Sequence, residues 1–146
     1  MSMLFVDTAG WVAAADAADP MSEAVRQTRD ACLKDGGTLV TTDYVCDETL
    51  TTIRFRLGLN AAERWWEQVE GSTRLRFEAV DPSRTQQARA LFFRYRDKDF
   101  SFTDCTSFVV MRQLRIRDVL TLDAHFAQMK FNVLPRTSDK AARSVR

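Results

Sequence analysis

Carboxylates are the side chains of this sequence that could carry chemistry. The chain has 20 aspartates and glutamates, one histidine (His125) and three cysteines that lack a metal-binding spacing. A zinc site built on several histidines is therefore excluded, and a Ser–His–Asp triad would need His125 without an accompanying GxSxG motif. We expect the cysteines to be buried free thiols and His125 to be a structural or surface residue. If the protein is an enzyme, its catalytic groups are carboxylates.

An aspartate follows each of the first four expected strands, at once or nearly so. These residues are Asp7, Asp43, Asp81 and Asp123. Each also precedes an expected helix, where aspartate is a favoured N-cap, so capping is the simpler interpretation of any one of them. Asp81 fits capping best because Pro82 follows it. The local pattern does not divide the four further.

Two more carboxylates stand in expected helices. Glu48 lies about 200° around its helix from the apolar stripe, on a face shared with Tyr44. It is either a partly buried glutamate that needs a cation or a surface residue packed on Tyr44. Asp104 falls in the first turn of an apolar helix, where a capping arrangement and the helix dipole both favour a carboxylate.

Strands and helices alternate along the chain, and no repeat or domain boundary interrupts them. The expected strands span residues 3–6, 38–41, 74–80, 119–122 and 131–134. The expected helices span residues 8–15, 22–34, 43–57, 60–70 (with Asn60 as N-cap), 82–96, 103–114 and 124–129. This alternation predicts an α/β fold of right-handed βαβ units, with a mostly parallel sheet covered on both faces. In such folds the chemistry lies outside the carboxyl ends of the strands.

Length and composition indicate one globular domain. The 146 residues are 45% hydrophobic and 28% charged, which excludes disorder of the whole chain. No apolar run approaches the roughly 20 residues that cross a bilayer, and the first residues do not form a signal peptide. We therefore expect a cytoplasmic protein without a membrane partner. Residues 1–135 are predicted to form the domain, and residues 136–146 a polar, disordered tail.

The net charge of +1 identifies no partner, but the basic residues are unevenly distributed. Five bases and one acid lie between Arg84 and Lys98, and four bases and one acid lie in the tail. Both segments could contact a polyanion, or they could be a solvated helix face and a frayed terminus.

Four segments, in this order, resemble the acidic motifs of PIN-domain ribonucleases, and VapC-type toxins in particular. They are Leu4–Ala13 (LFVDTAGWVA), Thr42–Thr49 (TDYVCDET), Phe100–Met111 (FSFTDCTSFVVM) and Leu120–Phe126 (LTLDAHF). The resemblance covers residues 3–135. It implies a three-layer α/β/α domain with strand order 3-2-1-4-5, and metal-dependent hydrolysis of RNA phosphodiester bonds.

The resemblance also implies site residues. The metal-binding and catalytic positions carry over as Asp7, Glu48, Asp104 and Asp123. Thr8 and Thr103 stand where the family often has a hydroxyl near the metal or the phosphate. With strand order 3-2-1-4-5, Asp7 and Asp123 flank the crevice at the switch point between strands 1 and 4, so Asp43 and Asp81 can remain N-caps. Gly10 replaces a small non-glycine residue common in the family, and we expect it to loosen the first helix without touching a ligand.

The implied ion is Mg²⁺ or Mn²⁺, because both prefer oxygen ligands. Such an ion would offset the repulsion between converging carboxylates, activate water and stabilise the transition state. Arg94, Arg96 and Lys98 could contact RNA phosphates and Tyr95 could stack on a base, although a solvated helix end explains them equally well. The pocket is expected to be acidic at its floor and basic at its rim.

The leading hypothesis is an endoribonuclease toxin that acts as a homodimer and is inhibited by a small antitoxin protein. In the toxins that the chain resembles, helices around Trp65 and Trp66 help form the dimer. The alternative is a PIN-fold module that binds RNA or protein without cleavage. A phosphatase on a doubly wound sheet is disfavoured, because Asp7-Thr8-Ala9 lacks the second aspartate of a DxD motif.

Overall fold

The computed structural model describes residues 2–136 and contains one five-stranded sheet. Its strands are β1 (Met3–Val6), β2 (Thr38–Thr42), β3 (Leu75–Glu78), β4 (Asp118–Leu120) and β5 (Asn132–Leu134). Their order is β3-β2-β1-β4-β5 and every pairing is parallel, which confirms the predicted topology. In the central strand, Phe5 pairs with Val40 of β2 on one side and with Val119 of β4 on the other.

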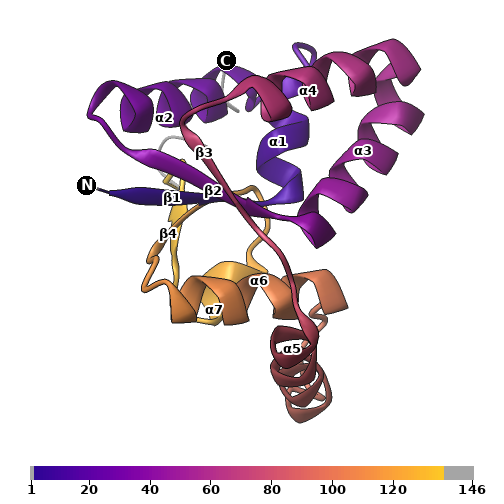
Figure 1. Cartoon of the computed structure of the whole chain (residues 1–146), viewed down its shortest axis with the longest axis vertical. Helices are drawn as coiled ribbons and strands as arrows, with labels where there is room; N and C mark the ends of the chain where they lie inside the picture. Colours follow the sequence, from indigo (N-terminus) through magenta and orange to yellow (C-terminus); the bar gives the residue numbers. More distant parts are fainter. Residues whose placement is uncertain (1, 137–146) are drawn as a thin grey trace.

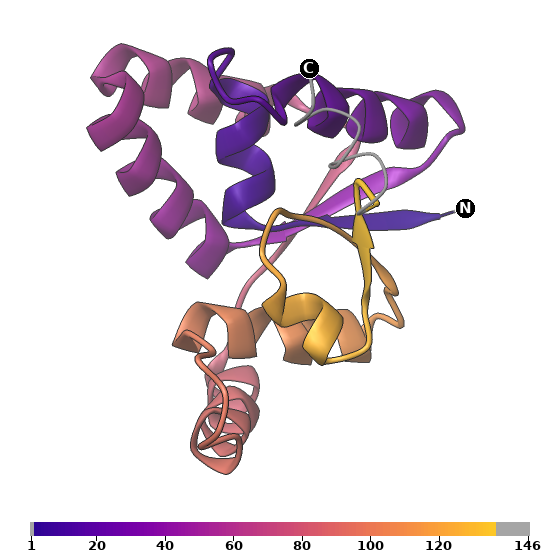
Figure 2. The same cartoon turned by 180° about the vertical axis from the view of Figure 1, so that it is seen from behind.

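Helices cover both faces of this sheet, as the alternation of elements predicts. They are α1 (Thr8–Ala15), α2 (Ser22–Lys34), α3 (Asp43–Leu57), α4 (Leu59–Gly71), α5 (Pro82–Arg94), α6 (Phe102–Gln113) and α7 (His125–Gln128). Helices α1 to α4 lie on one side and α5 to α7 on the other (Figures 1 and 2). The predicted tail lies outside the described residues, apart from Arg136. Within residues 2–136, no helix has both the length and the hydrophobicity needed to cross a membrane.

The core lies between the sheet and the two helical layers. Its largest fully buried side chains include Phe5, Phe108, Phe126, Ile53 and Met111. Each contributes about 1.5–3 kcal/mol relative to exposure, and together they hold the helices against the sheet. The three cysteines are free thiols as expected, although Cys32 is only half-buried while the other two are buried.

The N-caps of α3 and α4 differ from those expected from the sequence. Thr42, not Asp43, is the N-cap of α3, and its hydroxyl accepts a hydrogen bond from the Val45 N–H at 3.1 Å. The interpretation of Asp43 as an N-cap was therefore wrong. Its carboxylate accepts hydrogen bonds from its neighbour's N–H and from the Val80 N–H, and so ties α3 to the segment after β3.

The second difference is at α4, which begins one residue before the expected Asn60. Gly58 is its N-cap and also ends α3, with a φ of 99° that favours glycine. Asp81 does cap α5 as predicted, accepting a hydrogen bond from the Arg84 N–H at 2.8 Å.

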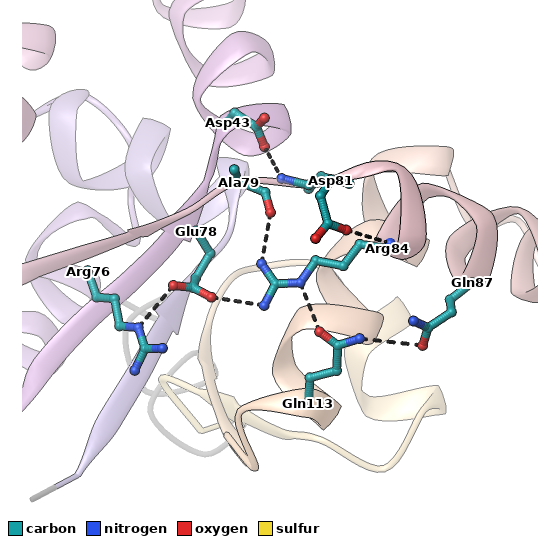
Figure 3. A network of polar contacts seen from close by, with 9 residues as sticks. Asp43, Arg76, Glu78, Ala79, Asp81, Arg84, Gln87 and Gln113 are labelled. Carbon is teal, nitrogen blue, oxygen red and sulfur yellow. Dashed lines mark hydrogen bonds and ion pairs between the residues drawn. The ribbon is translucent and has the colours of Figure 1, made fainter.

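Arg84 connects β3 to α5 and α6 (Figure 3). Its guanidinium donates hydrogen bonds to Glu78 at 2.9 Å, to the Ala79 carbonyl at 2.8 Å and to the Gln113 side chain at 2.8 Å. Burial by itself raises the pKa of Glu78, but hydrogen bonds from Arg84 and Arg76 outweigh it and lower that pKa below its usual range. The first base of the basic stretch therefore has a structural role.

Gly10 is required by close packing, which corrects the expectation that it loosens α1. A Cβ atom at this position would lie 2.3 Å from the backbone oxygen of Leu120, at the end of β4. Any other residue at position 10 would push α1 away from the sheet. This would happen close to Asp7, which directly precedes the helix. The glycine thus sets the distance between α1 and β4.

We predict that Gly10→Ala lowers the free energy of unfolding by about 2 kcal/mol or more, because backbone at this distance cannot yield as a side chain could. Gly71→Ala is the matched control, since an added Cβ there meets nothing within 4 Å. It should be neutral or stabilising by up to about 1 kcal/mol. Urea unfolding measures both variants. Equal midpoints for Gly10→Ala and wild type would show that the close approach is not needed.

Candidate functional site at the carboxyl edge of the sheet

The four acids selected from the sequence line one cavity. This open cavity of about 550 Å³ receives Asp7 from the end of β1, Glu48 from α3, Asp104 from α6 and Asp123 from the segment between β4 and α7. Thr8, at the start of α1, lines it as well. The structure therefore brings together residues up to 116 positions apart at the carboxyl edge of the parallel sheet.

Asp7 is held by Thr121, a residue that sequence reasoning missed. Asp7 is only 4% exposed, and its side chain makes no N-cap hydrogen bond to α1. Instead it accepts a hydrogen bond from the Thr121 hydroxyl at 2.9 Å. The same hydroxyl accepts one from the Asp123 N–H at 3.0 Å, so it links the two aspartates. A hydroxyl within the otherwise apolar segment 119–122, two residues before Asp123, was the available signal.

Asp104 caps its helix and faces the cavity at the same time. It forms a capping box with Ser101: each residue's backbone N–H donates to the other's side chain, at 2.9 and 3.1 Å. Oδ2 of Asp104, which accepts the hydrogen bond from the Ser101 N–H, also lies 3.0 Å from Nδ1 of His125. The capping and functional interpretations of Asp104 are thus compatible.

His125 belongs to the site, contrary to its interpretation as a structural or surface residue. Besides its contact with Asp104, its Nδ1 atom lies 3.2 Å from Oδ1 of Asp123. Its backbone N–H donates to that Asp123 oxygen at 2.9 Å. The D-x-H spacing was visible in the sequence, but nothing local indicates that a third residue from α6 lies opposite the imidazole.

The cluster is costly to ionise without a cation. Burial, and secondly the charge of Asp104, raises the pKa of Asp7 to about 7, although the Thr121 hydrogen bond opposes this. Burial also raises the pKa of Asp104, and the charge of Asp123 adds to the effect, while bonds from Ser101 and His125 oppose it. A divalent cation between these groups would remove the penalty.

The rim of the cavity differs from the expected basic rim. Along α3, Glu48, Thr52 and Arg56 line it at spacings of four residues, which places them on one helix face. Arg56 is the one lysine or arginine among the described lining residues, and Asp19 and Asp99 add two further acids. The cavity is therefore acidic with a single basic side chain, which sequence reasoning did not select.

The other predicted contact residues do not line the cavity. Arg94 ends α5 with its guanidinium 5.5 Å from the centre of the Tyr95 ring, and Arg96 follows in the exposed turn. Lys98 forms an ion pair with its neighbour Asp97 at 3.7 Å. Thr103 lies half-buried in the first turn of α6. These residues shortly precede Asp104 in the sequence. Any contact that they make with substrate would lie outside the cavity itself.

We predict that Asp7→Asn stabilises the metal-free protein, and does so more at pH 8 than at pH 5. An acid whose pKa rises from 3.8 to about 7 on folding holds its proton more tightly in the folded state, so stability falls as pH rises between those values and then levels off. The full difference corresponds to about 4 kcal/mol, and we expect a gain of roughly 1–3 kcal/mol at pH 8 because neighbouring acids adjust.

Urea unfolding in EDTA at both pH values measures this gain. Asp81→Asn is the control, because Asp81 is an exposed N-cap outside the cavity and asparagine caps as well. A gain for Asp7→Asn that is no larger at pH 8 than at pH 5 would contradict the predicted penalty.

Comparison with known proteins shows the family to which this chain belongs. The PIN domain family model matches residues 4–132. The 23S rRNA-specific endonuclease VapC20 of Mycobacterium tuberculosis is 30% identical over 129 residues, covering 88% of this chain and 95% of that protein. Ribonuclease VapC26 of the same organism is 26% identical over 139 residues, covering 90% of this chain and all of that protein.

Solved structures give the same result. The crystal structure of VapC20, described as a Sarcin-Ricin loop cleaving toxin, superposes with a TM-score of 0.81 at 29% identity, over 88% of this chain and 95% of that one. VapBC2 from Rickettsia felis shares the fold, with a TM-score of 0.68 at 10% identity over 90% of this chain and 96% of that one. The order of the strands, the four gathered acids and these similarities show that the chain belongs to the PIN-domain family and is of the VapC type.

Proposed function

We propose that this protein is a metal-dependent endoribonuclease that hydrolyses RNA phosphodiester bonds, as the toxin of a toxin–antitoxin pair. The observation that carries the proposal is the convergence of Asp7, Glu48, Asp104 and Asp123 in one cavity of a PIN domain. Its relatives VapC20 and VapC26 are named as an endonuclease and a ribonuclease.

The residues of the cavity fit a hard divalent cation. Carboxylate oxygens dominate the lining and no cysteine belongs to it, as Mg²⁺ or Mn²⁺ requires. The Thr8 hydroxyl is buried and has no hydrogen-bond partner among the described residues, so an oxygen donor is left over beside Asp7. Asp7, Glu48, Asp104 and Asp123 would hold the ion. When bound, it neutralises charge that develops on the scissile phosphate and lowers the pKa of a water molecule.

The protein's own contribution is to keep these ligands in place. Thr121 orients Asp7, and Ser101 orients Asp104, each through a hydrogen bond from a group that is fixed at an element's end. Carboxylates held in this way need no rearrangement when substrate arrives, which is the main advantage of a preorganised site. A binding module without cleavage, the alternative function, would not need all four acids together.

The few positively charged side chains near the four acids are the ones that would contact the substrate. Arg56 at the rim is placed to bind a phosphate next to the scissile one. Arg94, Arg96 and Lys98 lie farther out and would bind flanking phosphates, which accounts for affinity but not for chemistry. Thr8, which lines the cavity, would contact the metal or the phosphate, and Thr103, which lies outside the cavity, would contact only the RNA.

The proposal includes a small antitoxin, a homodimer and a cytoplasmic location. Large apolar side chains are exposed where α3 meets α4, with Phe55 81% and Leu59 58% accessible, and such a patch suits a protein partner. Trp65 does not serve this purpose, because it is buried and packs edge-on against Trp11 with ring centres 5.4 Å apart. Trp66 is half-buried and remains the tryptophan available for an interface.

We predict that Asp7→Asn and Asp104→Asn each remove most RNA cleavage, by at least about 100-fold, because each takes a charged ligand from the ion. Purified, antitoxin-free protein is incubated with a panel of RNAs in Mg²⁺ or Mn²⁺ and then in EDTA. Asp81→Asn is the control and should cleave like wild type. Cleavage that persists in EDTA, or in both aspartate variants, would refute the metal mechanism.

We also predict that Arg56→Ala weakens RNA binding several-fold and flattens its salt dependence, since loss of one phosphate contact lowers the slope for a single strand by about 0.7. Binding is measured in the Asp104→Asn background so that the RNA stays intact. The double variant Arg94→Ala/Arg96→Ala tests the outer contacts in the same assay.

Arg54→Ala is the matched control for Arg56→Ala, because Arg54 is exposed on the same helix but does not line the cavity. Equal salt slopes for Arg56→Ala and Arg54→Ala would mean that Arg56 is only a solvated charge. An unchanged slope in the double variant would mean the same for the end of α5.

A further inference from the structure

The imidazole of His125 is held with one ring nitrogen directed at two carboxylates. Nδ1 lies 3.0 Å from Oδ2 of Asp104 and 3.2 Å from Oδ1 of Asp123. On the other side, the buried Phe100 ring packs edge-on against the imidazole, with ring centres 5.5 Å apart. The backbone N–H of His125 also bonds to Asp123, which fixes the start of α7. The ring therefore has one orientation, and its nitrogen faces the cavity lining.

These distances equal those between ligands of one ion. Two donors at right angles on an ion with bonds of about 2.1 Å lie about 3.0 Å apart. One atom each of Asp104, Asp123 and His125 lies within 4.8 Å of the other two. The buried Thr8 hydroxyl, without a hydrogen-bond partner among residues 2–136, is an independent sign that this cavity is built to receive a ligand.

We propose that His125 is itself a metal ligand, so that the site has a mixed nitrogen and oxygen donor set and prefers a first-row transition ion such as Mn²⁺ to Mg²⁺. This inference rests on the proposed metal-dependent function. Imidazole nitrogen binds transition ions well, whereas Mg²⁺ favours oxygen donors and retains its water molecules. A site of four carboxylates alone would have no such preference from its donor set.

The competing role is a positioning one, in which Nδ1–H only donates hydrogen bonds to the two carboxylates. The sequence offers a clean test, because His125 is the one histidine of the chain. In a tag-free protein, any imidazole nitrogen that couples to bound Mn²⁺ must belong to this residue. Pulsed electron paramagnetic resonance detects this coupling directly and does not depend on activity.

The experiment compares wild type with His125→Asn and His125→Ala. Asparagine can still donate a hydrogen bond to the carboxylates, whereas alanine cannot. We expect an imidazole ¹⁴N coupling in Mn²⁺-loaded wild type that is lost in both variants. By calorimetry, both variants should bind Mn²⁺ about 10-fold more weakly or worse, with a smaller change for Mg²⁺. Circular dichroism checks that both variants fold.

Each other outcome overturns the inference in a distinguishable way. Mn²⁺ that binds to wild type without ¹⁴N coupling, or full Mn²⁺ affinity in His125→Asn, would make His125 a positioning residue and leave the proposed function intact. Absence of Mn²⁺ and Mg²⁺ binding to folded wild type would overturn this inference and the metal-dependent function together.

Discussion

The cost of burying neighbouring carboxylates, to which their mutual repulsion adds, is the constraint on which the rest of this structure depends. Asp7 is almost completely buried, and the charges of Asp104 and Asp123 act on it in addition to the loss of solvent. Such an arrangement is unfavourable for folding, and a bound cation would offset its cost. The hydrogen bonds of Thr121 and Ser101 keep the acids in place despite this repulsion. The buried carboxylates thus lower the stability of the fold, at the place where the proposed chemistry requires these carboxylates.

The fold brings these acids together through backbone contacts as well as side-chain packing. The end of β1 and the end of β4 are neighbours in the sheet, and the Asp7 N–H donates to the Leu120 carbonyl at 3.1 Å. Because Gly10 has no side chain, α1 can start directly above that same carbonyl. On the opposite face, Arg84 anchors α5 and α6 to β3, so the helix that carries Asp104 also has a defined position.

The charge distribution assigns different roles in the proposed function to the cavity and to its surroundings. Six carboxylates and one arginine line the cavity, which is a poor environment for RNA unless a cation is present. Binding of RNA would thus depend on the metal site, on Arg56 at the rim and on bases farther away. His125, if it is a ligand, makes the identity of the ion a property of this chain's own residues, because its nitrogen changes the donor set.

The sequence by itself determined the order of the elements, the parallel sheet and, through its four motifs, the strand order and the acids that meet. The element order and the parallel sheet follow from local periodicity, whereas the strand order and the four acids were implied by the resemblance of the motifs to those of PIN-domain ribonucleases. Only the tertiary structure decided where Thr121, His125, Arg56 and Gly10 lie relative to the acids. Thr121 meets Asp7 across 114 positions, and Gly10 is needed because of a carbonyl on another strand. No local pattern contains such information, because it depends on which atoms of distant segments come into contact once the chain has folded.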